Sequence, residues 1–185
     1  MRESSSSAFT HRFSRIGALV ALSACNYDFD QYAATRQTGF ISQTAWSLAS
    51  VDSQETQSED GRATNAFDDS SWTYWHTQWW GVQPPPPHQI VIDLGATYSI
   101  TRMRYTPRQD GNPNGMVKDY EFYVSDSTSD WSAPVRAGTF DASSTPTTVT
   151  FSPKVGRYVR FRALSAINGE PYTSVAEIDV AGTAQ

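Results

Sequence analysis

The stretch HQIVIDLGATYSITRMRYTP, residues His88–Pro107, decides the fold class of this chain. Apolar and polar side chains alternate in two segments of it, His88–Leu94 and Ser99–Pro107. Alternation over four to eight residues is typical of a β-strand that buries one of its faces. The stretch therefore predicts two consecutive strands.

The same alternation recurs at regular intervals along most of the chain, with turn residues between the segments. Pro84–Pro87 cannot donate ladder hydrogen bonds, and Gln109–Gly115 has the Gly, Asn and Pro content of a long turn. Short strands at regular spacing indicate an all-β sandwich or barrel. The further predicted strands are Trp46–Val51, Lys118–Ser125, Val135–Phe140, Thr147–Phe151, Arg157–Leu164 and Val175–Ala181.

Composition supports a folded domain and argues against several classes of protein. The chain has 185 residues, of which 38% are hydrophobic and 18% charged, enough apolar material for one buried core. The net charge of −5 argues against a nucleic-acid partner, which normally meets a basic face. The single cysteine, Cys25, cannot form a disulfide within the chain, and no apolar run reaches the roughly 18 residues of a membrane span.

Residues 1–25 have the pattern of a secretory signal. Basic residues precede the short apolar run IGALVALSA, and Ser23 and Ala24 stand directly before Cys25. With Leu22 they resemble the lipobox of bacterial lipoproteins, in which the cysteine is lipidated. We expect a secreted or cell-surface protein with a lipid anchor at Cys25 as its contact with a membrane; the alternative is a cytosolic tail with a chance apolar patch. Residues 26–43 are interpreted as a linker or lead-in.

The run EDGRATNAFDDSSWTYWHTQWW, Glu59–Trp80, concentrates carboxylates, one histidine and four tryptophans. Its Asp-Asp-Ser-Ser centre predicts a tight turn, and oxygen-rich turns suit calcium, which takes six to eight oxygen ligands. The aromatic half offers flat apolar faces beside polar groups. Two interpretations stay open: an ion-stiffened loop beside a binding surface, or a solvated turn followed by core aromatics.

Three separated stretches resemble the discoidin, or coagulation factor V/VIII C-type, domain over residues 44–182. They are WSLASVDSQETQSEDGRATNAFDDSSWTYWHTQW, IVIDLGATYSITRMRYTPRQDG and GRYVRFRALSAINGEPYTSVAEIDV, in the family's order. Within this superfamily the chain is most similar to bacterial family 32 carbohydrate-binding modules. The resemblance implies an eight-stranded jelly-roll β-sandwich of the galactose-binding-domain type, with binding loops at one end.

The resemblance also implies a structural calcium site. The family's ligand pattern is carried by a turn in the first half of the domain and by an Ala-Glu pair near its end. Asp69 and Trp72 depart from the family's usual residues and put the ligand set in question. The matching positions are Asn65, Asp68, Ser70, Thr73, Ala176 and Glu177.

A galactose site is implied at Glu59, His76, Trp79 and Arg108. Glutamate and arginine would bind hydroxyls, the histidine would distinguish the axial hydroxyl, and the indole would stack on the apolar sugar face. Tyr172 would close one side, and Asn114 stands where related modules carry a glutamate.

Each of these residues also has a structural interpretation. His76 could be a satisfied core histidine, and Arg108 could simply pair with Glu59. Trp79 and Trp80 could pack under the proline loop. Trp75, which alternates with His76, is expected in the core.

The sequence analysis therefore favours a non-catalytic, calcium-stabilised module that binds galactose-type glycans. An enzyme is the first rival, since Glu59 and Asp110 could serve as paired carboxylates, but one small sandwich leaves no room for a catalytic domain. Two further rivals are an accessory module of a glycosidase and a discoidin-type adhesion or membrane-surface domain. In the latter, Trp79 and Trp80 would be the exposed apolar groups.

Overall fold

The computed structural model describes residues 39–185. The predicted signal segment, including Cys25, and most of the predicted lead-in lie outside the described residues. The end of the lead-in packs on the domain, because the Ile41 amide donates to the Val180 carbonyl at 2.8 Å and Phe40 lies 4.4 Å beneath the Arg104 guanidinium. Within residues 39–185, no helix has the length and apolar character needed to cross a membrane.

The fold is all-β, as predicted, and two long bent strands organise it. Strand β3, His88–Thr106, runs for 19 residues, and β6, Thr147–Ala163, pairs with it antiparallel along almost its whole length. The sequence predicted each of these strands as two. The pairing shifts between Asp93 and Tyr98, where Gly95 has φ +78° and a Cβ would lie 2.7 Å from the Ala45 carbonyl oxygen. The bend interrupts the alternating pattern, so the sequence suggested two separate strands. The hydrogen-bonded ladder nevertheless continues through the bend.

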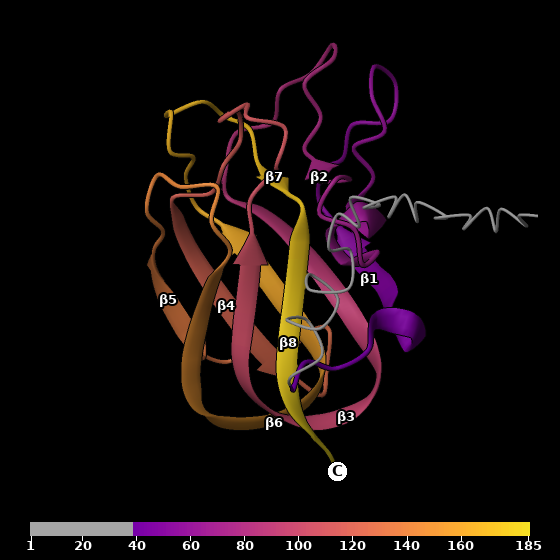
Figure 1. The fold of residues 1–185 in the computed structure, drawn as a ribbon. Helices are drawn as coiled ribbons and strands as arrows, with labels where there is room; N and C mark the ends of the chain where they lie inside the picture. Colours follow the sequence, from indigo (N-terminus) through magenta and orange to yellow (C-terminus); the bar gives the residue numbers. More distant parts are fainter. Residues whose placement is uncertain (1–38) are drawn as a thin grey trace, which may run out of the picture.

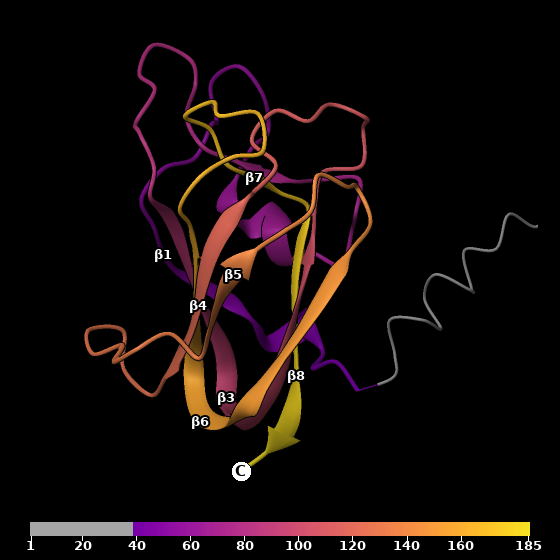
Figure 2. The same ribbon diagram turned by 90° about the vertical axis from the view of Figure 1, so that its left-hand side faces the viewer.

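The bends allow β3 and β6 to contribute to both layers of the sandwich (Figure 1). The first half of β3 pairs with β1, Ser47–Val51, and the second half of β6 pairs with β4, Asp119–Ser125, which in turn pairs with β5, Arg136–Thr139. The second half of β3 pairs with β8, Glu177–Ala184. Figure 2 shows the two layers edge-on, joined at the end where β3 and β6 turn.

Four short elements complete the chain. The two-residue strands β2, Trp75–His76, and β7, Ser174–Val175, form a separate antiparallel pair, and η1, Gln43–Ala45, and η2, Ala63–Phe67, are 3-10 helices. The count of eight strands agrees with the prediction, but β2 was not predicted as a strand, and the predicted Val175–Ala181 is divided at Ala176. A two-residue strand is shorter than the alternating segments of four to eight residues from which the other strands were predicted.

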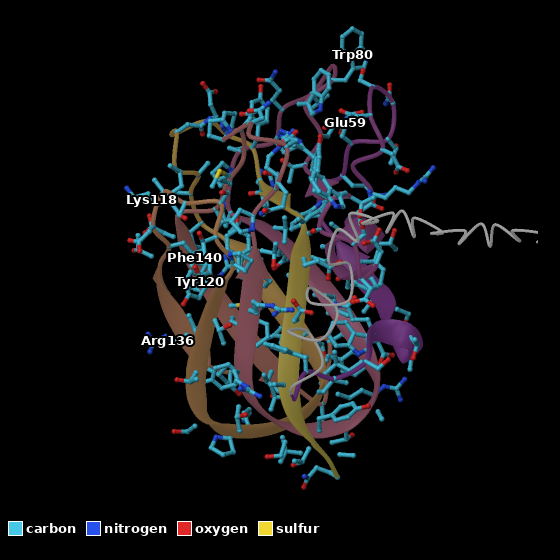
Figure 3. The ribbon with its side chains drawn as sticks, in the orientation of Figure 1. Glu59, Trp80, Lys118, Tyr120, Arg136 and Phe140 are labelled. Atoms are coloured by element: carbon cyan, nitrogen blue, oxygen red, sulfur yellow. The ribbon has the colours of Figure 1, made fainter. Side chains whose placement is uncertain are left out.

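Aliphatic and aromatic side chains together fill the space between the layers. Tyr120 and Phe140, labelled in Figure 3, stack with centroids 4.0 Å apart, and Phe140 also stacks on Tyr105 at 4.5 Å. Trp75 is fully buried, as predicted, and its indole N–H donates to the Ser53 carbonyl at 2.8 Å. This core fixes the sheet ends from which the loops emerge.

The loops between β1 and β2, β2 and β3, β3 and β4, and β6 and β7 gather at one end of the sandwich (Figures 1 and 2). These connections, with β2 itself, carry all six predicted sugar-binding residues.

Candidate functional site

A buried carboxylate holds two of the clustered loops together. Glu55 is fully buried, and its side chain accepts the backbone N–H groups of Gln57 (2.7 Å) and Ser58 (3.1 Å) through Oε1 and those of Trp79 (3.1 Å) and Trp80 (2.9 Å) through Oε2. Burial alone would raise the pKa of Glu55, but the four donors outweigh it and lower the pKa to about 2. An ionised Glu55 therefore fixes the backbone that carries the two tryptophans.

The pairing of β2 with neighbouring segments positions His76. The His76 N–H donates to the Gly61 carbonyl and its carbonyl accepts from the Glu55 N–H. A Cβ at Gly61 would lie 3.0 Å from the Cβ of His76, so a larger residue there would displace the histidine. The carboxylate that anchors the loops and the histidine of the candidate site are thus linked through one short stretch of backbone.

His76 is 1% exposed, and its Nδ1 lies 2.7 Å from the Thr77 carbonyl oxygen. A carbonyl can only accept, so Nδ1 carries the proton and Nε2 has the free lone pair. Burial lowers the pKa of His76, which favours this neutral form, although Thr77 and Glu59 oppose the shift. The ring lies against Tyr172, with centroids 5.7 Å apart. A neutral imidazole with a free Nε2 can accept a hydrogen bond from a hydroxyl.

Glu59 contacts two aromatic residues and the histidine. Its Oε1 accepts the indole N–H of Trp79 at 2.8 Å and lies 3.7 Å from the Nδ1 of His76. Its Oε2 accepts the hydroxyl of Tyr74 at 3.2 Å. These contacts orient the carboxylate while leaving acceptor capacity for further donors.

Arg108 continues the same network from another loop. Its guanidinium donates to both carboxylate oxygens of Asp110, to the Tyr74 hydroxyl at 2.9 Å and to the Asn114 carbonyl at 3.3 Å. Burial would lower the pKa of Arg108, but Asp110 outweighs it and raises the pKa; the same bonds lower the pKa of Asp110. The alternative interpretation, in which Arg108 pairs directly with Glu59, is replaced by a chain in which the Tyr74 hydroxyl links the two.

The structure therefore brings Glu59, His76, Trp79, Arg108 and Tyr172 into one connected group. Asn114 contributes to it through its backbone carbonyl, which accepts from Arg108 and from the Ser174 hydroxyl at 2.8 Å, while its side-chain oxygen faces Asn168. The sequence missed Tyr74 as a site residue and considered Asp110 only as part of the Gln109–Gly115 turn or as a carboxylate of the rival enzyme. The signal for Tyr74 was its alternation with Trp75, which places it on the same side as His76.

The predicted calcium-binding positions also meet in space. The Ser70 N–H donates to Glu177 Oε1 at 2.8 Å and to Asp68 Oδ1 at 3.0 Å, and the Thr73 hydroxyl donates to Asp68 Oδ2 at 2.7 Å. Asp68 and Glu177, far apart in the sequence, thus flank one turn. No group of three or more His, Cys, Asp or Glu side chains that could hold a metal occurs in residues 39–185. The donor set fits a hard cation only if backbone and hydroxyl oxygens supplement the two carboxylates.

Of the other predicted calcium positions, Asn65 lies in η2 and Ala176 lies between β7 and β8. The Asn65 side chain donates to the Asp60 carbonyl at 2.8 Å, and Ala176 is fully buried with its N–H bonded to the Thr106 carbonyl. The sequence missed Gln43, whose amide accepts from the Asp69 N–H at 3.0 Å and donates to Glu177 Oε2 at 2.9 Å. Gln43 therefore connects the lead-in to both sides of the turn.

Comparison with known proteins identifies the family to which this domain is similar. The family model for the F5/8 type C domain matches residues 44–178. A sialidase of Micromonospora viridifaciens is 41% identical over 169 residues, which cover 91% of this chain and 26% of the sialidase. The chain thus spans about a quarter of that relative's length.

Two solved structures from Clostridium perfringens are similar in fold and sequence. One is CpGH89CBM32-5, in complex with GalNAc-β-1,3-galactose, at 28% identity and a TM-score of 0.71, covering 77% of this chain and 99% of that one. The other is the family 32 carbohydrate-binding module of NanJ, in complex with galactose, at 29% identity and a TM-score of 0.67, covering 77% of this chain and 97% of that one.

Proposed function

The chain belongs to the F5/8 type C, or discoidin, domain family, and on this basis we propose that it is a non-catalytic module that binds terminal galactose or a related sugar. The observation that carries the proposal is the linked set Glu59–Tyr74–Arg108, with His76 beside Glu59. It combines an oriented carboxylate, a cationic donor and a neutral imidazole at the loop end of the sandwich. Carbohydrate recognition needs donors and acceptors of this kind beside an apolar face.

The chemistry of galactose suits these groups. A hydroxyl can donate to Nε2 of the neutral His76, and Glu59 can accept from others, while Arg108 supplies fixed donors. Trp79 is oriented by its bonds to Glu55 and Glu59, so its indole can serve as a platform for the C–H face of the sugar. The axial hydroxyl of galactose, read by His76, would separate it from glucose. The module found in NanJ, which resembles this chain, binds galactose.

A structural calcium ion is part of the proposal. Asp68 and Glu177 would supply carboxylates at the turn, Thr73 its hydroxyl and carbonyl oxygens, and Asn65, Ser70 and Ala176 backbone carbonyls. When bound, the ion would tie the 68–73 turn to β8. Its effect on the protein would be on stability, because binding to the native state alone raises the free energy of unfolding.

Two features support the absence of catalysis by this module. A glycosidase needs one carboxylic acid with a raised pKa, whereas the pKa of Asp110 is lowered by its bonds to Arg108. The similar region of the sialidase makes up about a quarter of that enzyme. We therefore propose that the module is an accessory binding domain for an enzyme that degrades glycans. We also propose that the protein is secreted or held at the cell surface through Cys25.

Binding of the purified full chain to a glycan array, with calcium and with chelator, tests the proposal. Retention on galactose-terminated glycans, and not on glucose-terminated ones, is the expected result. Retention without any such preference would contradict it. Turnover of aryl galactosides by the purified chain, abolished in Glu59→Gln, would contradict the non-catalytic role.

A further inference from the structure

Trp80 is a large apolar side chain that the core does not use. Trp80 is 56% exposed, whereas Trp79 beside it is half-buried. Figure 3 shows Trp80 at the outermost point of the loop end, farther from the sheets than Glu59. In the described part of the chain, its indole N–H donates to no other residue. Exposed indoles of this kind commonly mark binding surfaces.

The backbone that carries Trp80 is held firmly despite this exposure. Its N–H donates to buried Glu55 at 2.9 Å, and its carbonyl accepts from the Val82 N–H at 3.0 Å and from the Gln78 side chain at 3.2 Å. The ring lies perpendicular to that of Trp79, with centroids 6.2 Å apart. Because this backbone is already ordered, binding at Trp80 would cost little backbone conformational entropy. Glu55 therefore anchors the backbone of both tryptophans, whose rings lie perpendicular to each other.

The location of Trp80 relative to the proposed sugar site identifies its partner. A terminal sugar seated against Trp79, Glu59 and Arg108 must leave its glycosidic bond directed toward solvent, because the rest of the glycan stays outside. The next sugar then passes the outer margin of the loops, where Trp80 and the exposed Val82 stand. We propose that Trp80 is the platform for the second monosaccharide of a galactose-terminated glycan and so determines specificity beyond the terminal sugar.

This inference rests on the proposed sugar site and extends that site to the second monosaccharide of the ligand. A membrane surface is the competing partner for an exposed tryptophan. The net charge of −5 makes anionic membranes an unfavourable partner, and one tryptophan with one valine is a small apolar surface. The perpendicular arrangement beside Trp79 favours a ligand that is continuous with the sugar site.

Calorimetric titration of the full chain with methyl β-galactoside and with lactose tests the inference. We expect lactose to bind the parent about two- to tenfold more tightly than the monosaccharide, which is the range of one aromatic stacking contact. Trp80→Ala should abolish this gain and leave monosaccharide binding unchanged. Trp72→Ala, which removes another exposed tryptophan, should leave both affinities as in the parent.

Three outcomes would overturn the inference. The gain for lactose could persist in Trp80→Ala, Trp80→Ala could weaken both ligands equally, or it could change only binding to phosphatidylcholine vesicles. If the parent binds neither sugar, the proposed function itself fails, and the inference with it. Indole N–H resonances give a second measurement that does not depend on the variant's stability: lactose should shift the Trp80 signal, and methyl β-galactoside should not.

Discussion

The guanidinium of Arg108 lies 4.2 Å above the ring centroid of Tyr74 and donates to the hydroxyl of the same residue at 2.9 Å. Tyr74 thus orients the Arg108 guanidinium through two contacts, one with the face of its ring and one with its hydroxyl. Because the same hydroxyl donates to Glu59 at 3.2 Å, Tyr74 couples the positions of the two charged groups in the proposed site.

Removal of that hydroxyl should weaken sugar binding without unfolding the protein. Tyr74→Phe keeps the ring beneath Arg108 and loses one hydrogen bond to each charged neighbour, each worth about 1.5–3 kcal/mol when a charged group is involved. We expect galactose affinity to fall about tenfold and the melting temperature to fall as well, while the protein stays folded. Calorimetric titration and a melting curve measure the two effects. An unchanged affinity would show that Tyr74 does not orient the site.

Loss of the Glu55 charge should destabilise the loops and the tryptophan pair. Glu55→Gln replaces a charged acceptor of four N–H groups by a neutral amide, and we expect a loss of at least about 1.5–3 kcal/mol in the free energy of unfolding. Glu170→Gln, on an exposed loop, is the matched control and should melt as the parent does.

The same carboxylate predicts a dependence on acid. Since the pKa of Glu55 is lowered from 4.5 to about 2, its contribution to stability is complete above pH 4.5 and is lost as the pH falls toward 2. Melting temperatures of parent and Glu55→Gln should therefore converge over this interval. A constant difference across it would contradict the account of Glu55.

The two buried histidines should titrate on opposite sides of the ordinary histidine pKa. Burial opposes the charge of His88, but Asp52, 3.1 Å from Nδ1, and the Pro171 carbonyl, 3.0 Å from Nε2, outweigh it and raise the pKa of His88. Burial lowers the pKa of His76. In an NMR titration we expect the His88 ring to change above pH 6.5 and the His76 ring below it.

These shifts have opposite consequences for stability. The contribution of His88 to the free energy of unfolding is complete below pH 6.5 and is lost as the pH rises through its raised pKa. Because the pKa of His76 is lowered, protonation of His76 reduces the free energy of unfolding as the pH falls below 6.5. His88→Gln should therefore remove the loss of stability that the parent shows as the pH rises above 6.5. Because His88 binds the backbone next to Tyr172, the same variant should loosen that loop. Midpoints in the reverse order would contradict both assignments.

Calcium should raise the melting temperature of the parent and not that of a variant without the turn carboxylate. For calcium at one hundred times its dissociation constant, the expected gain is about 2.7 kcal/mol. Asp68→Asn should abolish the difference between calcium and chelator, whereas Asp126→Asn, in the distant loop after β4, should retain it. An identical melting curve of the parent with calcium and with chelator would reject the site.

Alternation in the sequence predicted the strand content and the burial of Trp75, because both follow from local patterns. It could not predict that His88–Thr106 is one strand, since the bend at Gly95 interrupts the apolar pattern but not the ladder. The sequence placed Arg108 in a loop, yet the residue is only 5% exposed because it contacts Tyr74 and Asp110. Arg108→Ala should therefore reduce stability as well as binding.

Glu55 shows why part of the site stays hidden from sequence reasoning. Its neighbours, Gln54, Thr56 and Gln57, are those of an ordinary polar loop, and its role comes from the backbone of residues 79 and 80. No residue type or spacing marks a carboxylate that binds backbone donors 24 and 25 positions away. By contrast, His76, Trp79 and Arg108 were identified through a family pattern that keeps the spacing of the site residues.

Titration of galactose and of glucose into the parent, Trp79→Ala and Arg108→Ala tests the central claim most directly. We predict that the parent binds galactose with a dissociation constant of about 0.1–1 mM, as a shallow site with few contacts should, and glucose more weakly. Each variant should lose about tenfold or more in galactose affinity, with circular dichroism used to verify that it is folded. Equal binding of galactose by the parent and both folded variants, or a preference of the parent for glucose, would contradict the account.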